Sequence, residues 1–195
     1  NTSNNKLRLG YDENGTCDSR TAEITISITN HAPVTFTLTQ KGNPAVPKGA
    51  INLGVYGGLY IAVANIGAQS PTDIGNRYAW GEVSTKSSYT WSNYKWGKEN
   101  AQTKYTGYAP ELSSDDDIAT KTLGKGWRMI TEYEWIHILE VCTLTRTTMN
   151  GVKGFKVTSK LNNNSVFIPS CGYQDGTSIK FKDEVFNWCK TGPSG

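Results

Sequence analysis

The stretch WRMITEYEWIHILEVC, residues 127–142, decides the class of fold. Thr131 and Glu134 have the T-x-x-E spacing of a capping box, in which two side chains satisfy backbone N–H groups at the start of a helix. The pattern therefore predicts a helix that runs to about residue 142. The apolar side chains expected on one face of this helix are Trp135, Ile136, Leu139 and Cys142.

Short strands are predicted on both sides of this helix. Downstream, strands are expected at 155–159 and 166–169, with the turn between them at the three asparagines 162–164. Upstream, the apolar runs at 51–55 and 59–64 also predict strands.

A second helix is predicted at 113–124. Ser114 is expected to cap it, and the acidic residues that follow suit the positive end of a helix dipole. Gly124 is expected to end it, because glycine readily adopts the conformation that terminates a helix. Two short helices among short strands predict an α+β fold.

Two alternating stretches near the N-terminus predict a β-hairpin. Apolar and polar residues alternate over 22–28 and over 34–38, and residues 30–33 supply the turn. The alternation is typical of strands with one buried face. Because an isolated hairpin is marginally stable, we expect these strands to have partners, and Leu7 and Leu9 predict a third strand.

A domain boundary is predicted after the hairpin. Residues 41–49 contain two prolines, which stiffen a chain, and are bracketed by two glycines. We therefore expect a partial β segment at 1–42, a linker at 43–50 and a separate domain at 51–195.

Composition excludes several classes of protein. The net charge is +3, from 20 Lys and Arg against 17 Asp and Glu, which is too weak and too evenly spread to predict binding to nucleic acid. No apolar run approaches the ~20 residues that span a bilayer, so no membrane span is expected. The opening residues, NTSNN, do not have the pattern of a signal peptide.

The four cysteines lack C-x-x-C spacing, and the chain has two histidines, so the sequence argues against a structural zinc site. Cys171 and Cys189 are a candidate disulfide if their strands meet. Cys142, on the apolar side of the predicted helix, is expected to be a buried free thiol.

Asp115, Asp116 and Asp117 are weak candidates for binding a hard cation such as calcium through oxygen ligands. The preferred interpretation is a charged helix start, with one aspartate buried against Trp127 or Arg128. No Ser-His-Asp arrangement or phosphate-binding glycine loop is present. We therefore expect no enzyme and no cofactor.

Six aromatic residues are concentrated in a stretch rich in Gly, Ser, Asn and Lys. Loops rich in Tyr, Ser, Gly and Asn suit molecular recognition, because aromatic rings offer a large contact area at low entropic cost. The alternative is that these rings pack the loop onto the domain, and we expect two or three of them to be exposed. The candidate ligand-binding residues are Tyr89, Trp91, Tyr94, Trp96, Tyr105 and Tyr108.

Several motifs from residue 51 onward occur in a characteristic order. They are INLG at 51–54, ANIGA at 64–68, YAWGE at 78–82, DDIA at 116–119, WRMIT at 127–131 with Glu134, NGVKGFKVT at 150–158, FIP at 167–169 and GY at 172–173. This order resembles the Fibrobacter succinogenes major paralogous domain family of Bacteroidetes. The resemblance implies a C-type-lectin-like domain with two short helices and a twisted antiparallel sheet.

The chain departs from that family at two places. Ile130 stands where proline is usual, and FNWC at 186–189 replaces a tyrosine-tryptophan-serine-serine stretch. The chain then ends before the last strands that the resemblance implies. In the first part, RTAEITI at 20–26 and VTFTLTQ at 34–40 resemble the last strands of a BACON-type, immunoglobulin-like domain.

The resemblances imply a non-enzymatic binding or adhesion module, extracellular or anchored at the outer-membrane surface as lipoproteins are, that recognises a glycan or a surface protein. The calcium-dependent sugar-binding motifs of lectins do not occur. The alternative function is a structural part of a surface complex or fimbrial tip. An exposed aromatic cleft favours the first function, and an unpaired strand edge favours the second. A formylglycine-generating catalyst is a third, disfavoured hypothesis, because Cys171 and Cys189 have no histidine near them in the sequence.

Overall fold

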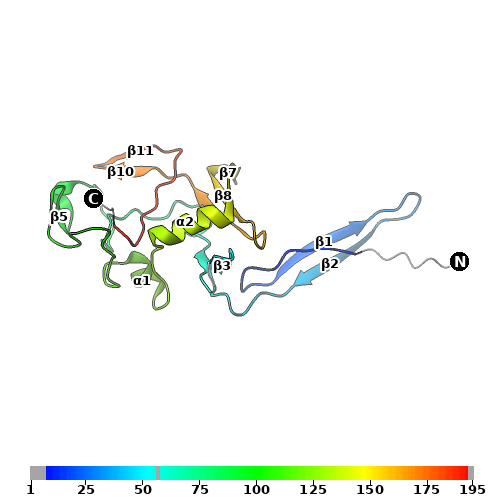
Figure 1. Ribbon diagram of the computed structural model, residues 1–195. Helices are drawn as coiled ribbons and strands as arrows, with labels where there is room; N and C mark the ends of the chain where they lie inside the picture. The colour runs from blue at the N-terminus through cyan, green and yellow to red at the C-terminus, as the bar shows by residue number, and fades with distance from the viewer. Residues whose placement is uncertain (1–7, 56–57, 193–195) are drawn as a thin grey trace.

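The computed structural model describes residues 8–55 and 58–192. Figure 1 shows a body that holds the α-helices and most strands, and a long two-stranded arm that extends away from it. Within the described ranges, few helices combine with small antiparallel sheets, so the predicted α+β class is confirmed. No helix in these ranges has the length and apolar character needed to cross a membrane.

The largest sheet of the body is antiparallel, in the order β7-β8-β9. Its strands are β7 (Cys142–Met149), β8 (Val152–Ser159) and β9 (Ser165–Pro169). The strands predicted at 155–159 and 166–169 are therefore confirmed, and the asparagine turn joins them. The sequence did not predict β7, because its polar residues outnumber its apolar ones and most of its side chains are exposed.

Helix α2 (Glu132–Val141) begins at the predicted capping box. The Thr131 hydroxyl accepts from the Glu134 N–H at 3.3 Å, and the Glu134 carboxylate accepts from the Thr131 N–H at 2.8 Å. Arg128 also donates to both carboxylate oxygens of Glu134. These hydrogen bonds from Arg128 lower the pKa of Glu134 to about 2.

The core-facing side of α2 differs from the predicted one. Ile138 and Cys142 are buried, whereas Ile136 and Leu139 are exposed. The segment 51–55 and the large sheet contribute the residues that pack around Ile138, so the stripe that meets the core is displaced from the predicted one. Sequence periodicity identifies apolar positions, but the neighbours decide which of them are covered.

An apolar cluster joins α2, the sheet and the segment that precedes β4. Its buried members are Ile51, Leu53, Val55, Ile138, Cys142, Val157 and Val166. The strands predicted at 51–55 and 59–64 shrink to β3 (Ala50–Ile51) and β4 (Ile61–Ala62), which pair with each other. Val46, inside the predicted linker, is also buried.

Helix α1 (Ile118–Leu123) is shorter than predicted and has a different cap. The Asp117 carboxylate accepts from the Thr120 N–H at 3.0 Å and takes the role that we assigned to Ser114. It also accepts from the Met129 N–H, so the buried carboxylate ties the helix start to the chain that leads into α2. Gly124 ends the helix as predicted, with a φ of 88°.

Three smaller elements border the body. They are the 3₁₀ turn η1 (Trp91–Asn93), the pair β5 (Gly97–Lys98) with β6 (Ala101–Gln102), and the pair β10 (Tyr173–Asp175) with β11 (Ser178–Lys180). Tyr89 and Gly176 exchange backbone hydrogen bonds of 2.9 and 2.7 Å. The loop before η1 is thereby joined to the β10–β11 hairpin.

The arm consists of β1 (Arg20–Ile26) and β2 (Val34–Gln40), which pair antiparallel as predicted. The prediction of a buried face is wrong, because no other element among the described residues pairs with the arm and its apolar side chains stay partly or fully exposed. The predicted third strand is also wrong at Leu9, which is exposed and lies in no strand. Leu7 lies outside the described residues.

The root of the arm is fixed to the body by backbone hydrogen bonds. The Asn52 N–H donates to the Gly15 carbonyl at 2.9 Å, and the Asn164 side chain donates to the Asn52 carbonyl at 2.9 Å. A Cβ at Gly15 would lie 2.1 Å from Asn164 Nδ2, so a glycine is required at this close approach. The arm therefore projects from a defined point next to the β8–β9 turn.

Replacing Thr131 with alanine removes the hydroxyl of the capping box. We expect Thr131→Ala to lower the free energy of unfolding by about 1 kcal/mol, because an N–H at the start of α2 loses its partner. Urea unfolding followed by circular dichroism measures the change. Thr131→Ser, which keeps the hydroxyl, is the matched control, and equal stability of the two variants would contradict the role of the cap.

Candidate binding site

An open hollow of about 1070 Å³ lies in the body. Residues from β4, the 74–80 segment, the η1 loop, both α-helices, β9 and the C-terminal segment line it. Its larger aromatic members include Trp91, Tyr94, Trp135, Tyr173, Phe186 and Trp188. We call this space the aromatic hollow.

One wall of the aromatic hollow is formed by the η1 loop. Trp91, which is 45% exposed, meets Tyr94 edge-on with ring centroids 5.5 Å apart. The Tyr94 hydroxyl donates to the Trp80 carbonyl at 2.9 Å, and burial together with the charge of Glu82 raises the pKa of Tyr94 to about 12. The Tyr89 hydroxyl donates to the Arg77 carbonyl, so these rings are held in place while Trp91 faces solvent.

The opposite wall comes from the C-terminal segment. Tyr173 and Phe186 meet edge-on at 5.1 Å, and Phe181 stacks on Tyr173 at 5.8 Å. The Trp188 indole N–H donates to the Tyr78 carbonyl at 2.8 Å. Phe186 and Trp188 are nevertheless exposed, so their hydrogen bonds and ring contacts position them without covering them.

Strand β9 contributes Val166, Phe167 and Ile168 to the lining of the aromatic hollow. The Ser159 N–H donates to the Asn164 carbonyl and the Ser170 N–H donates to the Lys153 carbonyl. Because bonded and non-bonded pairs alternate in an antiparallel ladder, this register points the N–H and C=O of Phe167 away from β8. Among the described residues no strand pairs with that second edge of β9.

Arg77 is a polar residue of the lining that the sequence did not single out. Its Nη2 donates to the Cys171 carbonyl at 2.6 Å. Its Nε is buried, with no hydrogen-bond partner in the described part of the chain. This arginine adds positive charge and free donor capacity to the aromatic hollow.

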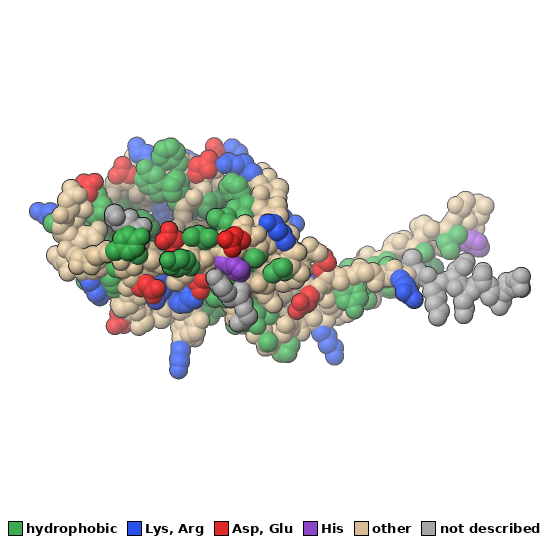
Figure 2. Space-filling view, viewed as in Figure 1, with side chains coloured by type: hydrophobic (Ala, Val, Ile, Leu, Met, Phe, Trp, Pro, Cys, Tyr) green, Lys and Arg blue, Asp and Glu red, His purple; other side chains and the backbone are tan. Residues whose placement is uncertain are grey.

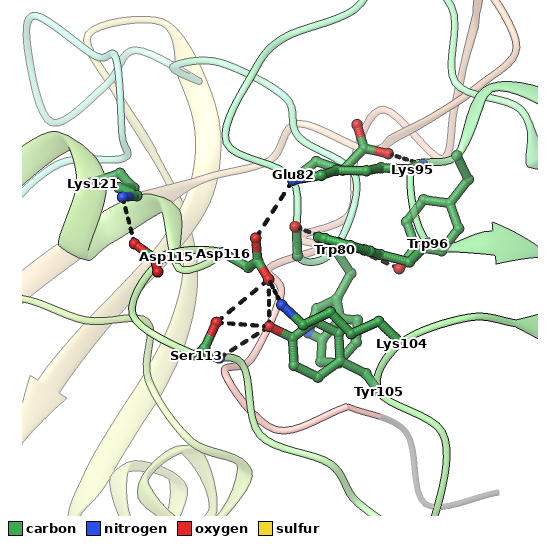
Figure 3. A network of polar contacts seen from close by, with 12 residues as sticks. Trp80, Glu82, Lys95, Trp96, Lys104, Tyr105, Ser113, Asp115, Asp116 and Lys121 are labelled. Atoms are coloured by element: carbon green, nitrogen blue, oxygen red, sulfur yellow. Dashed lines mark hydrogen bonds and ion pairs between the residues drawn. The ribbon is translucent and has the colours of Figure 1, made fainter.

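A buried carboxylate holds the long loop that follows the η1 wall (Figure 3). Asp116 is 4% exposed and accepts from Lys104 and from the Tyr105 hydroxyl, both at 2.6 Å. The Lys95 ammonium lies 3.6 Å from its other oxygen. Burial acts to raise the pKa of Asp116, but the hydrogen bonds from Lys104 and Tyr105 outweigh it, and the pKa is lowered.

The same lysines contact the ring of Trp96. The Lys95 and Lys104 ammonium groups lie 4.1 and 4.6 Å from its centroid, within the range of cation–π attraction. The indole N–H donates to the Gly81 carbonyl at 2.7 Å. Buried Glu82 accepts from the backbone N–H of Lys95 at 2.8 Å and from the Lys86 ammonium at 2.7 Å. Charged and aromatic groups therefore hold this loop in place together.

The six aromatic candidates therefore separate into three groups. Tyr89, Trp91 and Tyr94 line the aromatic hollow, and Trp96 and Tyr105 pack in the network around Asp116. Tyr108 is 82% exposed and lies outside the lining. Packing onto the domain thus accounts for Trp96 and Tyr105, two of the six rings are exposed, as expected, and ligand binding by the rings in the hollow stays a prediction.

The three aspartates have separate partners. Asp115 pairs with Lys121 at 2.8 Å on the surface, Asp116 holds Lys104 and Tyr105, and Asp117 caps α1. No three His, Cys, Asp or Glu side chains in the described ranges form a group suited to a metal ion. The arrangement matches the expected charged helix start, but two aspartates are buried rather than one: Asp117, which accepts from the Met129 N–H next to Arg128, and Asp116.

The candidate disulfide between Cys171 and Cys189 is not formed in the structure, where both cysteines are free. Cys171 Sγ instead lies 4.0 Å from the Phe186 carbonyl. Burial and, to a lesser degree, Glu132 raise the pKa of the Cys189 thiol. Cys142 is buried and free as predicted, and burial raises its pKa despite nearby Lys160.

In comparisons with known proteins, no family model, curated protein or solved structure matches this chain. The resemblances drawn from its motifs therefore stay predictions.

Replacing Asp116 with asparagine removes the charge that holds Lys104 and Tyr105. We expect Asp116→Asn to lower the free energy of unfolding by about 1–3 kcal/mol, because the buried carboxylate makes charge-assisted hydrogen bonds to Lys104 and Tyr105 that the amide weakens. Asp115→Asn is the matched control, since its ion pair is exposed and contributes little. Urea unfolding of both variants measures the difference, and equal effects would contradict the central place of Asp116 in the loop.

Proposed function

We propose that this chain is a non-catalytic binding module of the cell surface that recognises a glycan or a protein segment in the aromatic hollow. The observation that best supports this proposal is an open hollow of about 1070 Å³, lined by exposed aromatic rings from two parts of the chain that are distant in sequence. Ligand sites in proteins are typically concave and largely apolar, with a few polar groups that orient the ligand.

The chemistry of the lining supports recognition. Trp91 on one wall and Trp188 on the other offer ring faces on which sugar rings or apolar side chains stack. Arg77 supplies a buried Nε with free donor capacity. Rings already positioned by contacts such as Trp91–Tyr94 and Trp188–Tyr78 lose little entropy when a ligand binds.

The described side chains offer little support for catalysis. A reactive cysteine has a lowered pKa, but burial raises the pKa of both Cys142 and Cys189. Glu134 is held by Arg128 and by the cap of α2. These features disfavour the formylglycine-generating hypothesis and a catalytic role for Glu134.

We further infer that the body is a C-type-lectin-like domain and that the protein acts outside the cell or at the outer-membrane surface. The support is the order of the motifs between residues 51 and 173, together with two short helices that precede an antiparallel sheet. The hairpin at 20–40 is consistent with the last strands of an immunoglobulin-like domain.

A second candidate function, assembly into a surface complex or fimbrial tip, is favoured by a different observation. The outward edge of β9 and both edges of the arm lack strand partners among the described residues. Open strand edges are sites where other chains add strands.

Glycan and mucin arrays test the first function. We expect wild-type protein, applied at dilution where it is monomeric, to bind a defined subset of ligands equally well with and without EDTA. The double variant Trp91→Ala, Trp188→Ala is expected to lose at least about tenfold in affinity, because each ring contributes stacking worth about 1 kcal/mol or more.

Tyr108→Ala is the matched control, since this exposed ring lies outside the lining of the aromatic hollow. It is expected to bind as wild type does. Absence of binding by folded protein would remove the glycan version of the proposal. Equal losses in Tyr108→Ala and in the double variant would show that the aromatic hollow is not the site.

A further inference from the structure

The arm has an apolar face that the described part of the chain covers only in part, near the root, where the Asp12 carbonyl accepts from Arg20 and Gln40. In the register of the hairpin, Ile24 lies opposite Phe36 and Ile26 lies opposite Val34. Successive side chains of a strand alternate between faces, so these four side chains share one face. Phe36 is 39% exposed and Val34 is 63% exposed, and Figure 2 shows hydrophobic side chains at the surface of the arm.

The outer edge of β2 has none of the usual protection against pairing. Natural edge strands are guarded by charges, proline or bulges. The strand reads VTFTLTQ, with no charged residue and no proline, and its seven residues pair with β1 without a bulge. By contrast, β1 carries Arg20 and Glu23. The unguarded edge is therefore that of β2.

A matching edge lies in the aromatic hollow. Strand β9 reads SVFIP, without charge and with a proline only at its last position, and its outward groups come from Ser165, Phe167 and the carbonyl of Pro169. Phe167 is 4% exposed, so its outward N–H and C=O are poorly placed to be satisfied by bulk water. The other edge of the sheet, β7, is less suited because Arg146 on it pairs with Glu184.

We propose that the arm of one copy of this chain enters the aromatic hollow of a second copy, where β2 pairs with β9 and the apolar face of the arm packs against the aromatic lining. The proposal rests on the assembly role given above as the second candidate function. In this assembly contact, the occupant of the aromatic hollow is a strand of an identical chain.

The shape of the molecule requires that the donor be another copy. Figure 1 shows the arm extending away from the body, and its root is fixed by the bonds among Gly15, Asn52 and Asn164. The arm therefore points away from the aromatic hollow of its own body. Because donor and acceptor are different surfaces, the contact is heterologous, and repeated contacts extend into open chains of molecules.

Size-exclusion chromatography with light scattering tests the proposal on the whole chain. We expect wild-type protein to form oligomers whose mass rises with concentration. Phe36→Lys is expected to weaken association at least about tenfold, since it removes an aromatic side chain that the proposed contact would bury and places a charge on the β2 edge. Thr21→Lys, on β1 and on the opposite face, is the matched control and is expected to assemble as wild type does.

A mixing experiment distinguishes this contact from a symmetric one. Phe36→Lys lacks a functional arm but keeps the aromatic hollow, whereas Phe186→Glu keeps the arm but carries a charge in the aromatic hollow. We expect each variant alone to be monomeric and their mixture to form dimers and nothing larger. Circular dichroism establishes that both variants are folded.

Three results would overturn the proposal: monomeric wild type at every concentration, unchanged assembly of Phe36→Lys, or assembly of Phe186→Glu into symmetric dimers by itself. These outcomes are independent of the glycan arrays, which use dilute monomer and the Trp91→Ala, Trp188→Ala variant. The binding function and the assembly contact can therefore fail separately.

Discussion

The packing of α2 through Ile138 onto the large sheet and the 51–55 segment is the contact on which the rest of the structure depends. A helix of ten residues is too short to be stable in water without such packing. The cap formed by Thr131 and Glu134 fixes where the helix starts, and the apolar cluster with Leu53 and Val157 fixes which side faces inward. This cluster leaves the outward edge of β9 without a strand partner among the described residues, and the aromatic hollow adjoins it.

The walls of the aromatic hollow are held by a different kind of interaction. Much of the long segment between β4 and α1 lacks regular structure, so its backbone and side chains are satisfied by buried groups such as Asp116 and Glu82. These bonds hold in place the loop around Trp91, whose exposed ring lines the same hollow as that of Trp188. A ligand and an inserted strand would occupy the same space, so recognition and assembly are competing uses of one site.

Local signals in the sequence predicted local structure well. The capping box, the stop of α1 at Gly124 and the hairpin of the arm each depend on residues close together in the chain. Features that depend on distant contacts were missed. The core-facing side of α2 is set by the 51–55 segment. The aromatic hollow is lined both by Phe186 and by residues near Trp91, more than 90 positions earlier in the chain. We expected one face of the arm to be buried, because alternation places the apolar side chains of a strand on one face. Alternation does not show whether another element packs on that face.

The most direct test of the open β9 edge is amide hydrogen exchange along that strand. In dilute protein, the account predicts slow exchange at Val166 and Ile168, whose N–H groups point toward β8, and faster exchange at Phe167, whose N–H points away from β8. At concentrations where copies associate, the Phe167 amide is predicted to become protected. Equal protection of all three amides in dilute monomer would contradict the account, because it would show that the edge is already paired.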